Sequence, residues 1–145
     1  MNISPDEIRA QVNKFWDFYS RKSKTEFSEM YLASATVFAI DSRRMELARL
    51  MLVRRERELL GPASSVAAKL GPIDVQFLGA DLAVASYPVH LSITRVLPGG
   101  RIYQSEVPSG RVTQVFQRSL EGIPRILHEH MSSAEPVTVK ELPRT

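Results

Sequence analysis

The sequence predicts an α+β fold, in which N-terminal helices pack on one face of a curved antiparallel sheet. Near the N-terminus, apolar residues recur at helical spacing. From Ile73 onward they alternate with polar residues, as in strands, and short turns such as Leu97–Gly100 separate the alternating segments. The 145 residues suffice for one domain with a substantial core.

The first helix is predicted from its N-terminal residues. Ser4 can cap it, Pro5 suits its first turn, and Glu7 stands three residues after Ser4, as a capping box requires. An apolar stripe at helical spacing is expected to face the core and consists of Ile8, Val12, Phe15, Trp16 and Tyr19. A second, short helix is expected over Thr25–Leu32.

The middle of the chain is predicted to alternate between strand and helix. Thr36–Ile40 has the β-branched composition of a short strand. Ser42 can cap a long helix over Arg43–Leu60, which Gly61 and Pro62 would end. Ser64 or Ser65 is expected to start a small helix that closes at Gly71–Pro72.

The remainder is predicted to form strands over Ile73–Leu78, Leu82–Arg95, Arg101–Val107, Arg111–Arg118 and Ile123–Ser132. Pro88 indicates a bulge or a sheet edge, because proline cannot donate a ladder hydrogen bond. A period of two on the last strand puts Ile126, His128 and His130 on one face, and Glu129 on the other with its neighbours Leu127 and Met131. Residues 134–145 are expected to be a tail, in which Val137–Val139 could join a sheet edge or pack on a partner.

Residues 110–133, GRVTQVFQRSLEGIPRILHEHMSS, carry a family resemblance. Their hairpin resembles the C-terminal hairpin of SnoaL-like proteins, in the nuclear-transport-factor-like superfamily. Pro124 is a departure, because relatives often have an aromatic residue two positions before Ile126. The resemblance implies a SnoaL-like domain over residues 1–133, a cone-shaped sheet with the helices on its concave face, a pocket between them, and a homodimer through the outer sheet face.

Three histidines and one aspartate are the candidate catalytic residues. His128 and His130 share a strand face, but nothing local supplies a third metal ligand, so no metal site is expected. They suit either a core hydrogen bond or a pocket acid–base role. Asp41 is either a helix cap or a carboxylate at the pocket mouth, and His90 belongs to an exposed or dimer surface or to a wet cavity wall.

Trp16, Tyr19, Phe116 and Ile126 are the expected ligand-binding walls, because small-molecule sites are mostly apolar with a few polar groups. The expected partner is therefore a small apolar or amphipathic molecule. No cofactor is expected, since the sequence has no phosphate-binding glycine loop. A net charge of +3 does not indicate nucleic acid, and no membrane association is expected because no apolar run approaches the length of a membrane span. With no cysteine and no visible signal peptide, the cytoplasm is the expected compartment.

Two function classes follow. In the first, the chain is a small-molecule-binding protein, whose pocket side chains could catalyse an isomerase, cyclase or dehydratase reaction by moving a proton. In the second, it is a non-catalytic ligand-binding or dimerisation module like the association domain of calcium/calmodulin-dependent kinase II, which belongs to the same superfamily. The sequence leaves catalysis open, because one fold hosts many activities.

Overall fold

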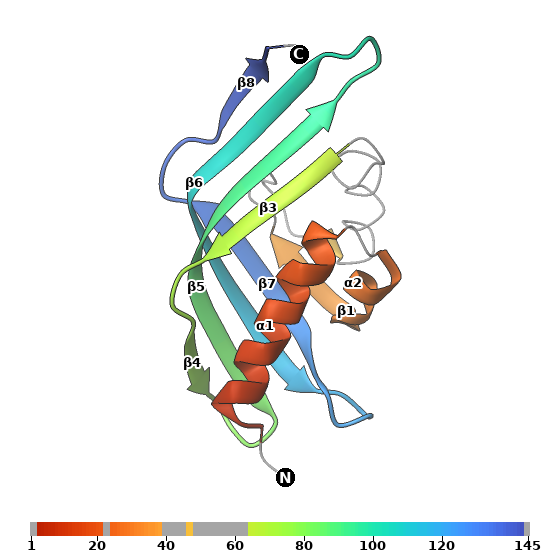
Figure 1. Ribbon diagram of the computed structural model, residues 1–145. Helices are drawn as coiled ribbons and strands as arrows, with labels where there is room; N and C mark the ends of the chain where they lie inside the picture. Colours follow the sequence, from red (N-terminus) through yellow and green to blue (C-terminus); the bar gives the residue numbers. More distant parts are fainter. Residues whose placement is uncertain (1–2, 22–23, 39–45, 48–63, 144–145) are drawn as a thin grey trace.

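The computed structural model describes residues 3–21, 24–38, 46–47 and 64–143. Two helices, α1 (Pro5–Ser20) and α2 (Lys24–Glu29), precede the long strands. The described strands are β1 (Tyr31–Phe38), β2 (Glu46–Leu47), β3 (Ser64–Leu70), β4 (Asp74–Phe77), β5 (Leu82–Val96), β6 (Ile102–Arg118), β7 (Pro124–Ser133) and β8 (Thr138–Leu142). Figure 1 shows α1 lying across one side of a strongly bent, unclosed sheet, which confirms the predicted α+β fold.

The sheet is organised around β5 and β6. Its strand order is β2-β1-β7-β6-β5-β3, with β4 also paired to β5 and β8 to β6. All described pairs are antiparallel except β1 with β7. The first half of β6 pairs with β8 and the second half with β7, so β7 and β8 lie along the same edge of β6, opposite β5.

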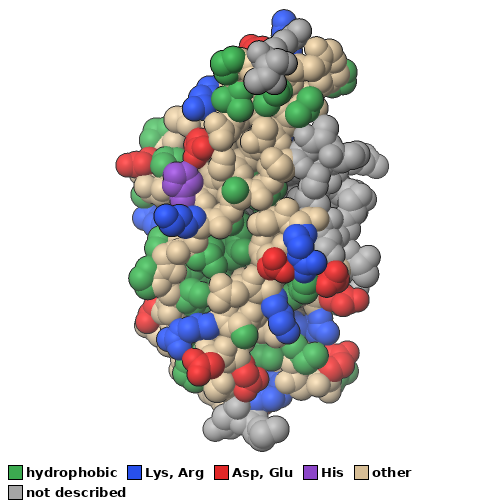
Figure 2. Space-filling view, viewed as in Figure 1, with side chains coloured by type: hydrophobic (Ala, Val, Ile, Leu, Met, Phe, Trp, Pro, Cys, Tyr) green, Lys and Arg blue, Asp and Glu red, His purple; other side chains and the backbone are tan. Residues whose placement is uncertain are grey.

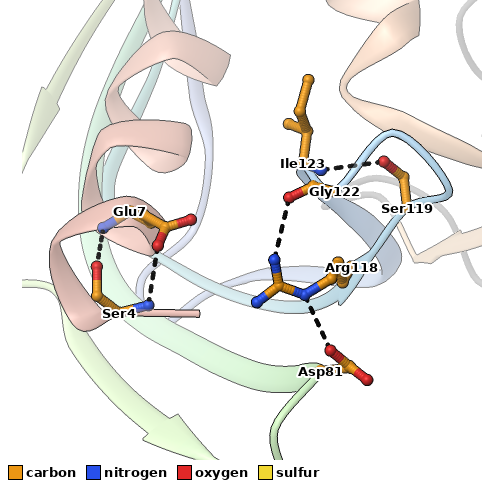
Figure 3. Close-up of polar contacts among 7 residues, drawn as sticks. All are labelled: Ser4, Glu7, Asp81, Arg118, Ser119, Gly122 and Ile123. Carbon is orange, nitrogen blue, oxygen red and sulfur yellow. Dashed lines mark hydrogen bonds and ion pairs between the residues drawn. The ribbon is translucent and has the colours of Figure 1, made fainter. Parts of the chain in front are cut away.

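The capping box and the apolar stripe of α1 are confirmed. The backbone amide of Glu7 donates to the Ser4 hydroxyl over 3.2 Å, and the Ser4 amide donates to the Glu7 carboxylate over 3.3 Å (Figure 3). The whole predicted stripe is buried: Ile8, Val12, Phe15, Trp16 and Tyr19. This face of α1 packs on the sheet and supplies much of the core.

The turn between β6 and β7 is held by side chains. Gly122 has a φ of +82°, which glycine adopts without a Cβ clash. Arg118 donates to the Asp81 carboxylate over 2.9 Å and to the Gly122 carbonyl over 3.3 Å, and the Ile123 amide donates to the Ser119 hydroxyl (Figure 3). Arg118 thus ties this turn to the one that precedes β5.

Three helix predictions need correction. Ser64–Leu70 is a strand, β3, because Val66 and alternate neighbours face inward while Ser65 and Lys69 are exposed. Within the helix expected over Arg43–Leu60, Glu46–Leu47 pairs with β1 as a strand, and the rest lies outside the described residues. The second helix ends at Glu29, because β1 already begins at Tyr31.

The two strands predicted on either side of Pro108 are one strand, β6. Val89 pairs with Gly110 and Leu91 with Val107, so β6 carries an extra residue at this point. Such a bulge bends the strand without ending it. The register shift adjoins Pro88, where a bulge or an edge was expected.

A second bulge changes the face assignment on β7. Phe116 pairs with Ile126 and Val115 with His128, which leaves Leu127 as an extra residue. Beyond a bulge the inward and outward positions exchange. The prediction that Ile126 shares a face with His128 and His130 was therefore wrong: Ile126 is buried, as are Glu129 and Met131.

Residues 138–142 form β8, which pairs with Ile102–Glu106 of β6.

Acidic and basic side chains are interspersed over the face seen in Figure 2. Neither described helix has the length and apolar character that a membrane crossing requires.

Candidate functional site

The interior of the described part contains a connected set of polar side chains. Gln114 and Glu129 are both 0% exposed and are the buried polar or charged residues of the core. The Gln114 amide nitrogen donates to Glu129 Oε1 over 2.7 Å, and the Tyr31 hydroxyl donates to Glu129 Oε2 over 3.0 Å. Tyr87 donates to Gln114 Oε1 over 2.7 Å and accepts from Trp16 Nε1 over 2.9 Å.

All these hydrogen bonds point toward Glu129. The indole N–H of Trp16 can only donate, so the Tyr87 oxygen accepts from it and donates its own proton onward. Gln114 then receives on its oxygen and donates from its nitrogen to the carboxylate. Because an ionised carboxylate is acceptor-only, the direction of the chain suits a negatively charged Glu129.

Neighbouring strands hold the network in register. Gln114 on β6 and Glu129 on β7 are direct cross-strand partners, and Val37 of the parallel strand β1 flanks Glu129 on its other side. Ala85 of β5 stands opposite Gln114 and is small enough to leave space for it. The helix α1 contributes Trp16 from above the sheet. The elements α1, β5, β6 and β7 thus each supply one member of the chain from Trp16 to Glu129, and β1 supplies Tyr31.

The Tyr87 hydroxyl of this network has a strongly shifted pKa. Burial raises the pKa of its hydroxyl well above its ordinary value, and the negative charge of Glu129 raises it further. The hydrogen bond from Trp16 acts in the opposite direction. Tyr87 therefore stays protonated over the physiological pH range and keeps donating to Gln114.

Aromatic rings pack beside this network. Phe15 lies 5.9 Å from Tyr31 and 5.1 Å from Trp16, measured between ring centroids, and Trp16 lies 5.5 Å from Tyr19. The residues predicted to bind a ligand are all interior: Trp16, Tyr19, Phe116 and Ile126 are at most 4% exposed. The structure thus brings these four to the same side of the sheet as Glu129.

His128 and His130 lie on the opposite side. His128 is half-buried, and its Nδ1 is 2.9 Å from the Thr36 hydroxyl. His130 is exposed, and the Phe38 ring lies 6.0 Å from the His128 ring and 5.6 Å from the His130 ring. The two histidines therefore line the outer sheet face, whereas Asp41 lies outside the described residues.

His90 is also on the outer face, on β5, far along the sheet from His128. Its Nε2 is 2.6 Å from Glu106 Oε2, and Ser92 donates to the other oxygen of the same carboxylate over 3.1 Å. The hydrogen bond from His90 is the main cause that lowers the pKa of Glu106. The three histidines are thus not brought together, and the described ranges contain no cluster of three potential metal ligands.

Sequence reasoning missed Glu129 and Gln114 as site residues. Both are polar positions within otherwise apolar strand faces, since Gln114 stands between Val112 and Phe116. A carboxylate at an inward-facing position needs hydrogen-bond or ionic partners, or serves a function, because burying its charge is costly. A polar residue within an apolar strand face was therefore the signal that could have pointed to Glu129 and Gln114. The bulge at Leu127 hid this signal. Strict alternation puts Glu129 and Ile126 on opposite faces of the strand, whereas both are buried.

Comparisons with known proteins identify the fold. No protein-family model matches the chain, and no curated protein matches its sequence. Among solved structures, the chain is similar to a ketosteroid isomerase-like protein from Erwinia carotovora atroseptica, with 13% identity, a TM-score of 0.71 and coverage of 94% of this chain and 100% of that one. The chain has the fold of the SnoaL-like and ketosteroid-isomerase-like proteins.

Two further solved structures share this fold. A Novosphingobium aromaticivorans protein assigned as a scytalone dehydratase has 9% identity and a TM-score of 0.75, over 96% of this chain and 89% of that chain. The calcium/calmodulin-dependent kinase II hub homology domain of Chlamydomonas reinhardtii has 17% identity and a TM-score of 0.67, over 90% and 98%. The fold thus occurs both in proteins named for enzymes and in a domain named as a hub.

Proposed function

We propose that the chain binds a small apolar or amphipathic molecule between α1 and the sheet, and that Glu129 exchanges a proton with it. The observation that carries this proposal is the fully buried Glu129 carboxylate, with hydrogen bonds from Gln114 and Tyr31 and aromatic rings beside it. Pockets for small molecules combine apolar walls with a few converging polar groups.

A buried carboxylate needs a physical reason to persist. Desolvation of its charge is costly, and hydrogen-bonded partners offset that cost only in part. A carboxylate in a water-poor interior is a suitable base for a C–H bond next to a carbonyl group, because proton transfer to a placed side chain speeds such steps by about 10² to 10⁴. The Tyr31 hydroxyl, 3.0 Å from Oε2, supplies a second proton-carrying group beside it.

The comparisons support this class of reaction without choosing a substrate. Two of the similar structures carry the names of a dehydratase and of an isomerase-like protein. Dehydration and isomerisation of carbonyl compounds both begin with removal of a proton beside a carbonyl group. Glu129 would perform that removal, and Trp16, Tyr19, Phe116 and Ile126 would form the apolar surroundings.

Binding of 2-naphthol, followed by its fluorescence, tests the proposal. This planar phenol can donate its O–H to a carboxylate, so wild-type protein should bind it. Glu129→Gln, which keeps the size but removes the charge, should weaken binding about tenfold, the effect of losing a hydrogen bond to a charged group. Glu106→Gln makes the same chemical change on the outer face and should leave the affinity unchanged. Equal affinities for the wild type and Glu129→Gln would contradict the proposal.

A second candidate is an assembly role, in which the outer sheet face forms a homodimer. This face carries Phe38 close to the rings of both His128 and His130, and neither described helix covers it (Figure 1). The similarity to a hub homology domain also favours an assembly role. Light scattering after size exclusion should then give twice the 16.3 kDa of one chain. His130→Glu should shift the protein to the monomer, and a wild-type monomer would exclude this candidate.

A further inference from the structure

A groove separate from the interior network lies on the outer side of the sheet, where the sheet bends. Its volume is about 390 Å³, and β3, β5 and β6 line it together with Ala134. Exposed side chains on its rim include Lys69, Pro88, His90 and Arg111, whereas the alternate residue Val89 is buried in the core.

The strand register brings three nitrogen-bearing side chains to this groove. Lys69 of β3 pairs directly with His90 of β5, and Arg111 of β6 pairs directly with Pro88, two residues from His90 on the same face. Directly paired residues have Cβ atoms about 5 Å apart. The three side chains can therefore reach one small group from three strands.

The groove contains two glycines at which a larger side chain would clash with β5. A Cβ on Gly71 would lie 2.3 Å from Pro88 Cγ, and a Cβ on Gly110 would lie 2.8 Å from the Val89 carbonyl oxygen. The Pro88 ring therefore lies close against Gly71 and the Val89 carbonyl close against Gly110, and the bulge at Pro108–Ser109 bends β6 beside them. The result is a recess with a basic rim and apolar walls that include the proline rings.

Two cationic side chains at the groove are not paired with a carboxylate of the described ranges. In the described part of the chain, Lys69 and Arg111 form no ion pair, while His90 is hydrogen-bonded to Glu106. Two cations thus remain without a carboxylate partner beside a recess. Arginine suits the tetrahedral oxygens of phosphate through its fork of donors, and lysine contributes a point charge.

We propose that this groove binds the phosphate group of a small phosphate monoester. Lys69 and Arg111 hold the phosphate oxygens, and the ligand's apolar portion packs on Pro88 and Pro108. The site is independent of Glu129, so its success or failure does not depend on the interior proton-transfer function.

Phenyl phosphate, inorganic phosphate and phenol are the probes, and calorimetry at low and high salt gives the affinities. Phenyl phosphate should bind more tightly than inorganic phosphate, and phenol should not bind in the groove. Lys69→Met and Arg111→Met should each weaken phenyl phosphate binding about tenfold, the loss expected for a charged hydrogen bond. Lys14→Gln removes one exposed cation from α1 and should have no effect beyond general screening.

Backbone amide NMR signals locate the ligand. Phenyl phosphate should shift the signals of Gly71 and Gly110, and not that of Gly122 at the distant β6–β7 turn. Three results would each overturn the proposal: no binding of phenyl phosphate, equal weakening by Lys14→Gln, or loss of binding in Glu129→Gln but not in Arg111→Met. Tighter binding of inorganic phosphate than of phenyl phosphate would also overturn it, because the apolar walls would then contribute nothing.

Discussion

Gln114 connects Tyr87 to Glu129, because its side chain accepts a hydrogen bond from the first and donates one to the second. Gln114→Leu keeps a similar volume but removes one donor to the carboxylate and the acceptor of the Tyr87 hydroxyl. Leaving buried polar groups without partners costs about 1–3 kcal/mol each. We expect the free energy of unfolding in urea to fall by about 2–4 kcal/mol.

Gln117→Leu on the same strand is the matched control. Gln117 is exposed on the outer face, so the identical substitution should change the free energy of unfolding by less than about 0.5 kcal/mol. If Gln114→Leu were as stable as Gln117→Leu, the buried network would contribute nothing to stability.

Tyr87 predicts a loss of stability at alkaline pH. Its folded pKa is raised, mainly by burial and next by the charge of Glu129, whereas tyrosine in the unfolded chain titrates near pH 10. Below that pH both states keep the proton and the contribution to stability is fully present. Above it, only the unfolded chain loses the proton, so the free energy of unfolding declines until the folded pKa is reached, by up to about 1.4 kcal/mol per pH unit.

Urea unfolding of the wild type and of Tyr87→Phe at pH 9 and pH 11 measures this decline. The phenylalanine variant should have the smaller loss between the two pH values, because it has no proton to release at this position. Its lower stability at pH 9, caused by the missing hydrogen bonds, is a separate effect. Equal losses in the two proteins would show that Tyr87 titrates alike in the folded and unfolded states.

At the residue scale, the sequence predicted burial better than it predicted chemistry. Trp16, Tyr19, Phe116 and Ile126 were expected as apolar walls of a ligand pocket; their side chains are buried, and ligand binding by them stays a prediction. The histidines were chosen because imidazole suits acid–base work, but His130 is exposed on the outer face. Side-chain chemistry alone does not say which way a strand residue points, and that direction changes at each bulge.

At the scale of elements, the close approach of β5 and β6 depends on Gly110. Gly110→Ala would put a Cβ 2.8 Å from the Val89 carbonyl oxygen and 2.9 Å from Val89 Cγ1, so the strands must move apart. Overpacking of this kind costs about 1–3 kcal/mol. Thermal unfolding should therefore show a lower midpoint for Gly110→Ala.

Gly79→Ala is the control at this scale, because a Cβ at Gly79 has nothing within 4 Å. That substitution should be neutral or stabilising by up to about 1 kcal/mol, since alanine restricts the unfolded chain. If Gly110→Ala and Gly79→Ala had the same thermal unfolding midpoint, the strands would accommodate the added Cβ without loss of stability, which would contradict this prediction.

The elements that the sequence predicted correctly are those with local signals. The capping box of α1, the turn at Gly122 and the alternation of β5 each depend on residues close in sequence. The strand β3 was mistaken for a helix because Ser64–Ser65 suits a helix start, while its pairing with β5 involves residues about 25 positions away. Long-range pairing of this kind overrides local propensity.

At the scale of the molecule, the order of elements was enough to predict the fold class. Helices followed by long antiparallel strands leave one sheet face to be covered by α1, as Figure 1 shows. A curved sheet was also expected, but the positions of the bulges in β6 and β7, which bend these strands, were not deducible from that order. The same bends place Glu129 inside and create the groove outside.

Deuterium exchange into 2-tetralone in D2O, followed by proton NMR, tests most directly whether Glu129 moves a proton. This small apolar ketone has acidic C–H bonds beside its carbonyl group. Wild-type protein should exchange these protons faster than buffer alone, and Glu129→Gln should reduce the protein-dependent rate by about 100-fold or more. Glu106→Gln should exchange at the wild-type rate. A wild-type rate equal to that of buffer, or to that of Glu129→Gln, would contradict a proton-transfer function for the interior carboxylate.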